Sequence, residues 1–296
     1  ILSAYQKRIF QLLKSQKYNL IWLEKEAFPW LPAWLELLIL RLSTPYVVDY
    51  DDAIFHRYDS HSSALIRFSL GKKIDKIMAN AALVIAGNDY LATRAKQAGA
   101  KNISILPTVI DLKLYPISQQ PNNSTFTIGW IGSPMRSYTY LRAIWPALKQ
   151  VCQDSSTKVV AIGAANMQLE GVPLEIKPWS ESTEVAEMQK FDVGIMPLID
   201  SAFERGKCGF KLIQYMASCR PVIGSSVGVN RKIIEDGVNG FQVDDIASWI
   251  TAIEKLKADK NLRASMGKAG RSKVEQCYSL QKNAPILAEL LKNASQ

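Results

Sequence analysis

The sequence is poor in the side chains that bind metals or form disulfides. Its 296 residues include four cysteines and only two histidines, His56 and His61. The cysteines stand at positions 152, 208, 219 and 277 and form no Cys-x-x-Cys pair. This spacing argues against a disulfide framework and against a zinc site, and it is typical of a protein from a reducing compartment.

No apolar run is long enough to cross a bilayer. The most apolar stretch, residues 30–42, is interrupted by Pro32, Glu36 and Arg41, whereas a spanning helix needs about 20 predominantly apolar residues. We predict that this stretch is a core helix of the amino-terminal domain. Because it carries tryptophans and the chain is basic, the alternative is peripheral docking on an anionic membrane surface. Residues 1–15 indicate an amphipathic helix rather than a signal peptide.

The overall composition is that of an ordinary globular protein. Hydrophobic residues make up 48% and charged residues 21% of the chain, which argues against a disordered, collagen-like or coiled-coil protein. The length corresponds to about two domains, at ~150 residues each. The formal net charge of +9 suits a phosphate-bearing ligand, an anionic membrane surface or nucleic acid. The dispersed basic residues, without interleaved aromatic residues, argue against nucleic acid.

Short apolar runs alternate with helical stretches along the whole chain. The runs typical of buried parallel strands are 19–23, 46–50, 83–86, 103–106, 125–131, 158–162, 174–176, 192–196, 221–224 and 240–243. Helices are predicted between them, for example over 65–82, 138–152 and 211–217, and a last helical stretch over 245–293. Residues 116–124, rich in Pro, Asn, Gln and Ser, are the predicted linker.

This alternation predicts an α/β protein with two Rossmann-like, doubly wound domains that face each other across a cleft. The first domain is expected over residues 1–115 and the second over 125–296. An alternative for the last helix is that it packs back on the first domain. A ligand is expected in the cleft, at the carboxyl ends of the strands.

Gly132, Ser133 and Arg136 lie where a predicted strand turns into a helix. Glycine lets the backbone approach a ligand, the amino terminus of a helix attracts an anion, and Arg136 adds a full positive charge. The alternative is an ordinary strand–helix turn. Neither a Gly-x-Gly-x-x-Gly motif nor a Walker A motif stands here, so dinucleotide binding and P-loop chemistry are not supported.

Lys207 and Lys211 follow the run 192–196 and therefore lie beyond the carboxyl end of a strand. Lys211 falls in the first turn of a predicted helix, where a cation is unfavourable by itself. A bound anion would remove this penalty, whereas the alternative is a pair of solvated lysines. A residue that is unfavourable in its local structure, at the end of a strand, is typical of a functional site. We therefore predict that these lysines bind phosphate.

Asp49, Asp51 and Asp52 close the run 46–50 and contain an Asp-x-Asp pattern. Carboxylates of this kind suit Mg²⁺ or Mn²⁺. The alternatives are general acid–base catalysis, hydrogen bonding to substrate hydroxyls, and a simple acidic turn. His56, a few residues further on, is of a type that titrates near neutral pH.

Two longer segments carry a family resemblance. KCGFKLIQYMASCRPVIGS (207–225) and GVNRKIIEDGVNGFQV (228–243) resemble the carboxy-terminal domain of family 4 glycosyltransferases, which have the GT-B fold. GWIGSP (129–134) and VVDYDDAIF (47–55) resemble one bacterial branch of that family. In members of the family, a strand and a glycine-rich loop come before the position that corresponds to Ile1. The resemblance therefore implies that the amino-terminal domain is incomplete here.

The resemblance also implies roles for single residues. The family has two glutamates in this region: the second, near the nucleotide ribose, falls on Gln214, and the first, near the donor sugar, falls on Gly206. Glu204 or Asp200 is expected to replace the missing side chain. Asp51 falls where many members carry a histidine.

The diphosphate is expected to meet Lys207 or Lys211 together with Arg136. The nucleobase is expected near Lys177 and Trp179. The predicted donor-binding residues are Gly132, Ser133, Arg136, Lys177, Trp179, Glu204, Gly209, Phe210 and Gln214.

The implied function is the transfer of a hexose from a UDP- or GDP-sugar to a saccharide or lipid-linked acceptor, with retention of configuration. Lys207, Lys211, Asp51 and Asp52 are the predicted catalytic residues, and the two aspartates are expected to face the acceptor. Neither a metal ion nor another cofactor is expected. The alternatives are a non-catalytic nucleotide-sugar-binding protein, suggested by Gly206, and a sugar-nucleotide epimerase. The expected location is the cytoplasm, with the membrane's inner face as the place for peripheral docking.

Overall fold

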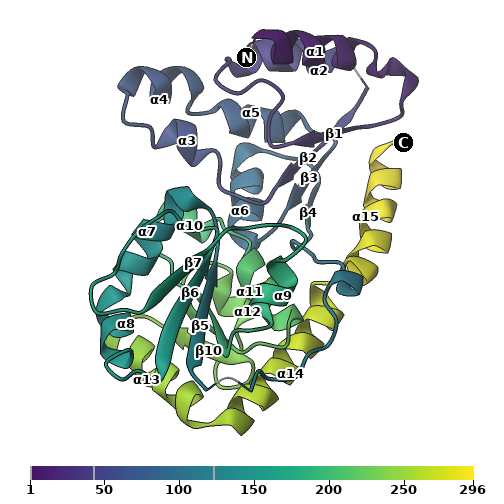
Figure 1. Ribbon diagram of the computed structural model, residues 1–296. Helices are drawn as coiled ribbons and strands as arrows, with labels where there is room; N and C mark the ends of the chain where they lie inside the picture. Colours follow the sequence, from purple (N-terminus) through teal and green to yellow (C-terminus); the bar gives the residue numbers. More distant parts are fainter. Residues whose placement is uncertain (1, 43, 123) are drawn as a thin grey trace. The chain divides into compact units, whose positions relative to one another are not determined.

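The computed structural model describes residues 2–42, 44–122 and 124–296 and divides the chain into two compact units (Figure 1). Unit 1 comprises the residues up to 108 together with Ser201–Cys208 and Asn283–Gln296. Unit 2 comprises Val109–Asp200 and Gly209–Lys282. Two short segments from late in the sequence therefore complete the amino-terminal unit.

This division differs from the boundaries expected from composition. Residues 109–122 belong to unit 2, where Tyr115 lies in the core. Arg220 Nη2 donates hydrogen bonds of 2.6 Å to Ser118 Oγ and to the carbonyl of Gln119. The predicted linker is thus held on unit 2, because its polar groups find partners there although it has no regular structure. Asn123, within the predicted linker, lies outside the described residues.

Unit 1 is built on a four-stranded sheet with the order β1-β2-β3-β4, all neighbours parallel. The strands are β1 (Ile21–Glu24), β2 (Tyr46–Tyr50), β3 (Leu83–Ala86) and β4 (Ile103–Ile105). The helices are α1 (Leu2–Leu13), α2 (Ala33–Arg41), α3 (His56–Asp59), α4 (Ala64–Leu70), α5 (Lys73–Asn80), α6 (Asp89–Ala98), α10 (Ala202–Arg205) and most of α15 (Leu280–Ala294), with the 3-10 turn η1 (Ser15–Lys17).

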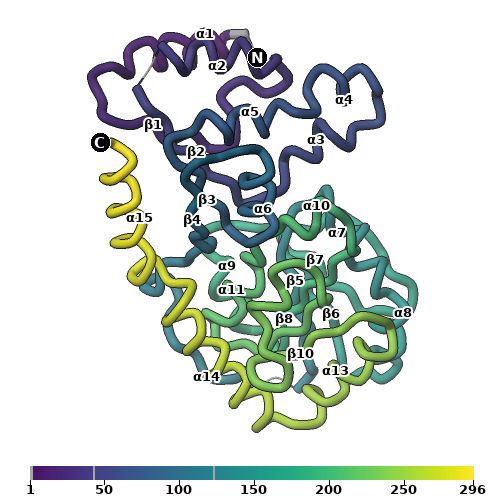
Figure 2. The backbone as a smooth tube through the Cα atoms, turned by 180° about the vertical axis from the view of Figure 1, so that it is seen from behind, coloured from purple at the N-terminus to yellow at the C-terminus, as the bar shows by residue number. Residues whose placement is uncertain are grey.

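Alternate residues of these strands face opposite sides of the sheet and lie in two apolar clusters. Val48 and Val84 belong to the larger cluster, which contains residues of α2, α5 and α6. Val47 and Leu83 face the other side and pack against Leu287 and further residues of α15. Figure 2 shows α15 alongside this sheet. Both faces of the sheet are covered, as is usual for parallel strands.

A buried ionic cluster in unit 1 fixes the loop between β1 and α2. Lys73 Nζ lies 2.7 Å from Glu26 Oε2 and 3.1 Å from Glu36 Oε2, and the three side chains are at most 3% exposed. Tyr58 donates a hydrogen bond of 2.8 Å to Glu26 Oε1, and the Ala27 amide donates one of 2.6 Å to Glu36 Oε1. Each buried charge therefore has charged and neutral partners, which lowers the cost of its desolvation.

Unit 2 is built on a six-stranded parallel sheet with the order β10-β9-β8-β5-β6-β7. The strands are β5 (Phe126–Ile131), β6 (Thr157–Ile162), β7 (Leu174–Lys177), β8 (Val193–Met196), β9 (Val222–Ser225) and β10 (Gly240–Val243). The helices are α7 (Pro134–Ala143), α8 (Trp145–Val151), α9 (Glu184–Met188), α11 (Phe210–Ala217), α12 (Asn230–Ile233), α13 (Ile246–Ala258) and α14 (Lys260–Cys277), with the 3-10 turn η2 (Leu112–Leu114). In Figure 1, α8 and α13 lie on one side of the sheet, and α9 and α11 lie on the other.

The ten predicted strands all form, and their bounds agree with the structure to within two residues. Three long helical stretches are divided, however. The stretch 65–82 breaks before α5, and 138–152 breaks at Ile144, where Pro146 lies in the first turn of α8. The stretch 245–293 breaks at Asp259, whose side chain accepts a hydrogen bond from Leu262 N and caps α14, and breaks again before α15. Caps and prolines therefore restart helices where hydrophobic periodicity alone predicts continuity.

The apolar segment 30–42 forms α2, which is buried on only one face. Leu37 and Leu40 are buried in unit 1, whereas Trp34 and Leu38 are exposed. Among the residues that the structure describes, no helix is both long and apolar enough to span a membrane.

We expect Lys73→Ala to lower the free energy of unfolding by about 3–5 kcal/mol, because Glu26 and Glu36 would stay buried without their cation. The measurement is urea-induced unfolding followed by tryptophan fluorescence. The neighbouring Lys72→Ala is the control, since Lys72 is exposed. Equal effects of the two substitutions would show that the cluster does not hold unit 1 together.

Candidate functional site

The strand order of unit 2 reverses at β5, which places a topological switch point there. The chain runs from β5 to β6 and β7 on one side, and then to β8, β9 and β10 on the other. Connections that leave adjacent strands toward opposite faces open a crevice at the carboxyl ends of these strands. A ligand site is therefore expected just after β5.

A pocket of about 950 Å³ opens at this edge. Its volume is at the upper end of the ~300–1,000 Å³ that small-molecule sites enclose. The residues that line this switch-point pocket all belong to unit 2: Ile131, Gly132, Ser133, Pro134, Gly163, Ala164, Pro178, Trp179, Glu181, Glu184, Phe210, Lys211 and Gln214. The pocket thus brings together six of the predicted donor-binding or catalytic residues: Gly132, Ser133, Trp179, Phe210, Lys211 and Gln214.

Lys211 is held over aromatic rings in this pocket. Its ammonium nitrogen lies 4.9 Å from the ring centroid of Trp130 and 5.6 Å from that of Tyr140. Both rings are buried, and their faces attract a cation without neutralising its charge. A Cβ at Gly132 would lie 2.9 Å from Lys211 Cε, so the absence of a side chain at Gly132 makes room for the lysine. The lysine side chain thereby lies beside Gly132, which precedes α7.

Gln214 and Trp179 are joined by a carboxylate that sequence patterns did not single out. Glu184 Oε1 accepts a hydrogen bond of 3.2 Å from Gln214 Nε2, and Glu184 Oε2 accepts one of 2.6 Å from Trp179 Nε1. Gln214 Nε2 also donates to Tyr115 Oη at 3.1 Å. Glu184 comes from α9, five residues after Trp179 but 30 residues before Gln214, and no local motif marks it. The tertiary fold brings this side chain to Gln214.

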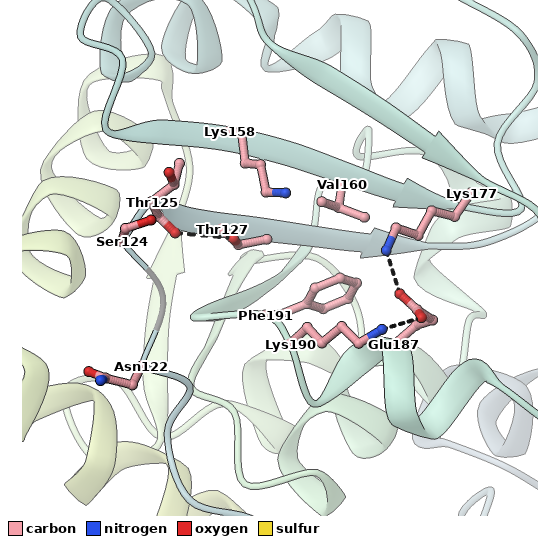
Figure 3. A pocket seen from close by; sticks show the side chains of 10 residues that line it. All are labelled: Asn122, Ser124, Thr125, Thr127, Lys158, Val160, Lys177, Glu187, Lys190 and Phe191. Carbon is pink, nitrogen blue, oxygen red and sulfur yellow. Dashed lines mark hydrogen bonds and ion pairs between the residues drawn. The ribbon is translucent and has the colours of Figure 1, made fainter.

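Lys177 and Arg136 lie outside the lining of the switch-point pocket. Lys177 Nζ is 2.6 Å from Glu187 Oε2 and lines a separate pocket of about 430 Å³ together with Lys158 and Lys190 (Figure 3). Figure 3 shows Lys177 and Lys190 pointing toward the same Glu187 carboxylate. Hydrogen bonds from these two lysines lower the pKa of Glu187. Arg136 is exposed in the first turn of α7.

Lys207 belongs to unit 1, although it stands only four positions before Lys211. Its Nζ lies 3.8 Å from Asp52 Oδ1 and 5.2 Å from the ring centroid of Phe203. Asp51 Oδ1 in turn lies 2.8 Å from Lys25 Nζ. The two lysines predicted to act together are therefore held by different units, Lys207 beside Asp52 and Phe203 and Lys211 over Trp130 and Tyr140.

The segment around Gly206 is tied to the carboxyl end of β3. Asn88 Nδ2 donates hydrogen bonds of 2.9 Å and 3.1 Å to the carbonyls of Gly206 and Lys207. A Cβ at Gly206 would lie only 2.4 Å from Ala53 Cβ, so this backbone has no room for a side chain there. The glutamate of the family pattern is excluded at this position by packing. Glu204, expected as its replacement, is buried and accepts a hydrogen bond from Ser201 Oγ.

Gly209 and His56 are both constrained by the residues around them. Gly209, at the start of α11, has a φ of +70° and would place a Cβ 2.3 Å from Ile233 Cδ1. His56 is held between Asp59 Oδ1 and Tyr90 Oη, each at 2.8 Å. Among the described residues, no group of three or more His, Cys, Asp or Glu side chains is arranged to hold a metal ion.

Two α/β units, each built on a parallel sheet, give the chain the GT-B fold. A family model described as "Glycosyl transferases group 1" matches residues 125–259, which is somewhat less than half of the chain. No curated protein sequence matches the chain significantly.

Solved structures of similar fold cover nearly the whole chain. HepE of Anabaena, in complex with UDP-glucose, is 17% identical with a TM-score of 0.76, covering 96% of this chain and 82% of that one. Sucrose-phosphate synthase from Thermosynechococcus elongatus is 17% identical with a TM-score of 0.73, covering 97% and 79%. A glycosyltransferase from Rickettsia africae is 13% identical with a TM-score of 0.67, covering 98% and 81%. At such identities the likeness establishes the fold.

We expect the contribution of Asp49 to the stability of the folded chain to fall as the pH rises from about 4 to about 6. Burial raises the pKa of Asp49 from 3.8 to about 6, and the negative charges of Asp51 and Glu24 add to the shift. Between these values the folded state binds more protons than the unfolded state, so deprotonation opposes folding.

Asp49→Asn removes this titration, and we expect the variant to gain stability relative to the parent as the pH rises through that window. The measurement is the thermal midpoint at about pH 4 and about pH 7. Glu170→Gln is the control, since this carboxylate is 83% exposed. A parent-to-variant difference that is independent of pH would contradict the assignment.

Proposed function

We propose that the protein is a retaining glycosyltransferase that moves a hexose from a nucleotide-sugar donor to a saccharide or lipid-linked acceptor. The observation that carries the proposal is the Lys211 ammonium group, held over Trp130 and Tyr140 in the switch-point pocket. The match of residues 125–259 to the glycosyl transferases group 1 model supports it.

The chemical demand of this reaction is the stabilisation of a departing diphosphate. A lysine ammonium and the backbone amides at the start of α7 supply positive charge that is in place before the bond breaks. Gly132 and Ser133 precede this helix and line the same pocket. With a protein cation at this position, a divalent metal ion is not required, and we propose that none is used.

The rest of the pocket suits a nucleoside. Trp179, half exposed at the rim, offers a ring face on which a base can stack. Glu184 and Gln214 present a carboxylate and an amide, which can hydrogen-bond the two hydroxyls of a ribose. Glu184 thereby supplies the acidic group that the family pattern has at the position of Gln214. The complex of HepE with UDP-glucose favours uridine as the nucleoside.

The acceptor is assigned to unit 1. Asp51 and Asp52 follow β2 and are paired with Lys25 and Lys207, so they present carboxylates that can accept hydrogen bonds from sugar hydroxyls. Lys207 is then a positioning residue of this acidic pair. The four cysteines form no disulfide with one another, and we propose the reducing cytoplasm as the location.

Two other functions remain as outcomes of the tests. A non-catalytic nucleotide-sugar-binding protein is favoured by Gly206, where packing excludes the family's glutamate. A sugar-nucleotide epimerase would convert the donor without any acceptor.

We expect Lys211→Ala to weaken UDP binding by about 10- to 100-fold, the range for a lost hydrogen bond to a charged group. The measurement is isothermal titration calorimetry with UDP and GDP. Lys268→Ala, a change of an exposed lysine of the same unit, is the control. Unchanged UDP affinity in Lys211→Ala would refute the role of this lysine.

We expect the protein to release UDP from a UDP-hexose faster when an acceptor is present, and the product of an α-linked donor to be α-linked. Proton NMR of the product reports the anomeric configuration. A β-linked product would refute retention. Tight UDP binding without any turnover would favour the binding protein, and conversion of the donor without acceptor would favour the epimerase.

A further inference from the structure

Large apolar side chains are exposed on one side of unit 1. In Figures 1 and 2, helices α1, α2 and α4 lie on the same side of this unit, with the strands β2, β3 and β4 below them in both views. The exposed large apolar residues of these helices and of the turn before α2 are Phe10, Leu13, Trp30, Trp34, Leu38, Leu65 and Phe68, which we call the apolar face.

On α2 the exposure is a property of one helical stripe. Trp34 and Leu38 are four residues apart, lie on the same side of the helix, and are 66% and 54% exposed. Leu37 and Leu40 on the opposite side are buried in unit 1. The helix thus has an additional apolar stripe, which takes no part in the core of unit 1.

A second stripe lies on α4 and adjoins α2 through Trp30. Leu65 and Phe68, three residues apart, are 74% and 91% exposed. The Trp30 ring packs edge-on against the ring of His61, just before α4, with a centroid distance of 5.9 Å. Trp30 has a φ of +66°, a conformation that is strained for a bulky residue. The strained backbone of Trp30 thus holds an indole ring that is half exposed.

Basic residues accompany the apolar face, and two segments that contribute to it lack acidic residues. Residues 1–23 and 60–74 contain no aspartate or glutamate. Lys14 Nζ lies 5.3 Å from the ring centroid of Phe10, and Lys17 Nζ lies 5.1 Å from that of Tyr18. The one glutamate of α2, Glu36, is buried and paired with Lys73. The charge presented beside the apolar side chains is therefore positive.

We propose that the apolar face docks on the surface of an anionic lipid bilayer. Tryptophan, phenylalanine and leucine side chains enter the boundary between headgroups and acyl chains, while lysines keep their ammonium groups among the lipid phosphates. An exposed apolar patch is otherwise costly in water. A second copy of the chain is the less suitable occupant, since two equally basic faces repel each other. This inference does not rest on the proposed transferase activity.

The experiment is flotation of the purified protein with vesicles of phosphatidylcholine alone and of phosphatidylcholine with phosphatidylglycerol. We expect binding to the anionic vesicles and little binding to the neutral ones. The variant Trp34→Gln/Leu38→Gln/Phe68→Gln is expected to lower the partition coefficient at least tenfold. Lys14→Gln/Lys17→Gln is expected to lower it about fivefold per lysine, and only for anionic vesicles.

The matched control is Leu114→Gln/Ile117→Gln/Val238→Gln, three comparably exposed apolar residues of unit 2, which is expected to bind like the parent. Circular dichroism and the thermal midpoint establish that each variant is folded. Equal loss in the control and in the apolar-face variant would overturn the proposal, and so would absence of binding by the parent. A parent that sediments as a dimer without lipid, and becomes a monomer in the apolar-face variant, would overturn it in favour of self-association.

Discussion

Parallel strands must be covered on both faces, and this constraint decides where polar chemistry can be placed. All six residues of β5 are buried, and two glycines allow rings to lie directly on the sheet. A Cβ at Gly129 would lie 1.9 Å from the Phe191 ring, and one at Gly194 would lie 2.2 Å from the Tyr215 ring. Charged groups therefore gather at the strand ends, where the connecting loops are free to vary.

The same constraint explains why Lys207 and Lys211 have different surroundings. The chain leaves unit 1 after Cys208 and enters α11 of unit 2 through Gly209. Lys207 is still packed beside the loop after β2, with Asp52 as its partner. Lys211 has already reached the aromatic rings at the end of β5. Two lysines only four positions apart are therefore divided by the change of unit.

The strands could be predicted from the sequence because their signal is local. Runs such as Val47–Val48 and Val159–Val160 are short, branched and flanked by polar residues, and hydrophobic burial follows directly from that pattern. Helix ends were harder, because Asp259 and Pro146 act through single hydrogen bonds and ring geometry rather than through periodicity.

Only some residues of the switch-point pocket could be predicted from the sequence. Gly132 and Lys211 follow strands and could be found as residues at strand ends. Glu184 could not, because its place between Trp179 and Gln214 depends on how α9 packs across the sheet. Gly206 shows the opposite case: the sequence reveals a departure from the family pattern, and its cause is the Ala53 side chain in a segment far away along the chain.

The placement of α15 affects how the chain assembles during synthesis. Val47, Leu83 and Ile85 emerge early, yet their apolar partners Leu287 and Leu291 emerge only after the whole of unit 2. Domains commonly fold in the order of their synthesis, but here one face of the first sheet stays uncovered until α15 has been synthesised. Until then the growing chain exposes the apolar side chains of Val47, Leu83 and Ile85, a surface that a chaperone can shield.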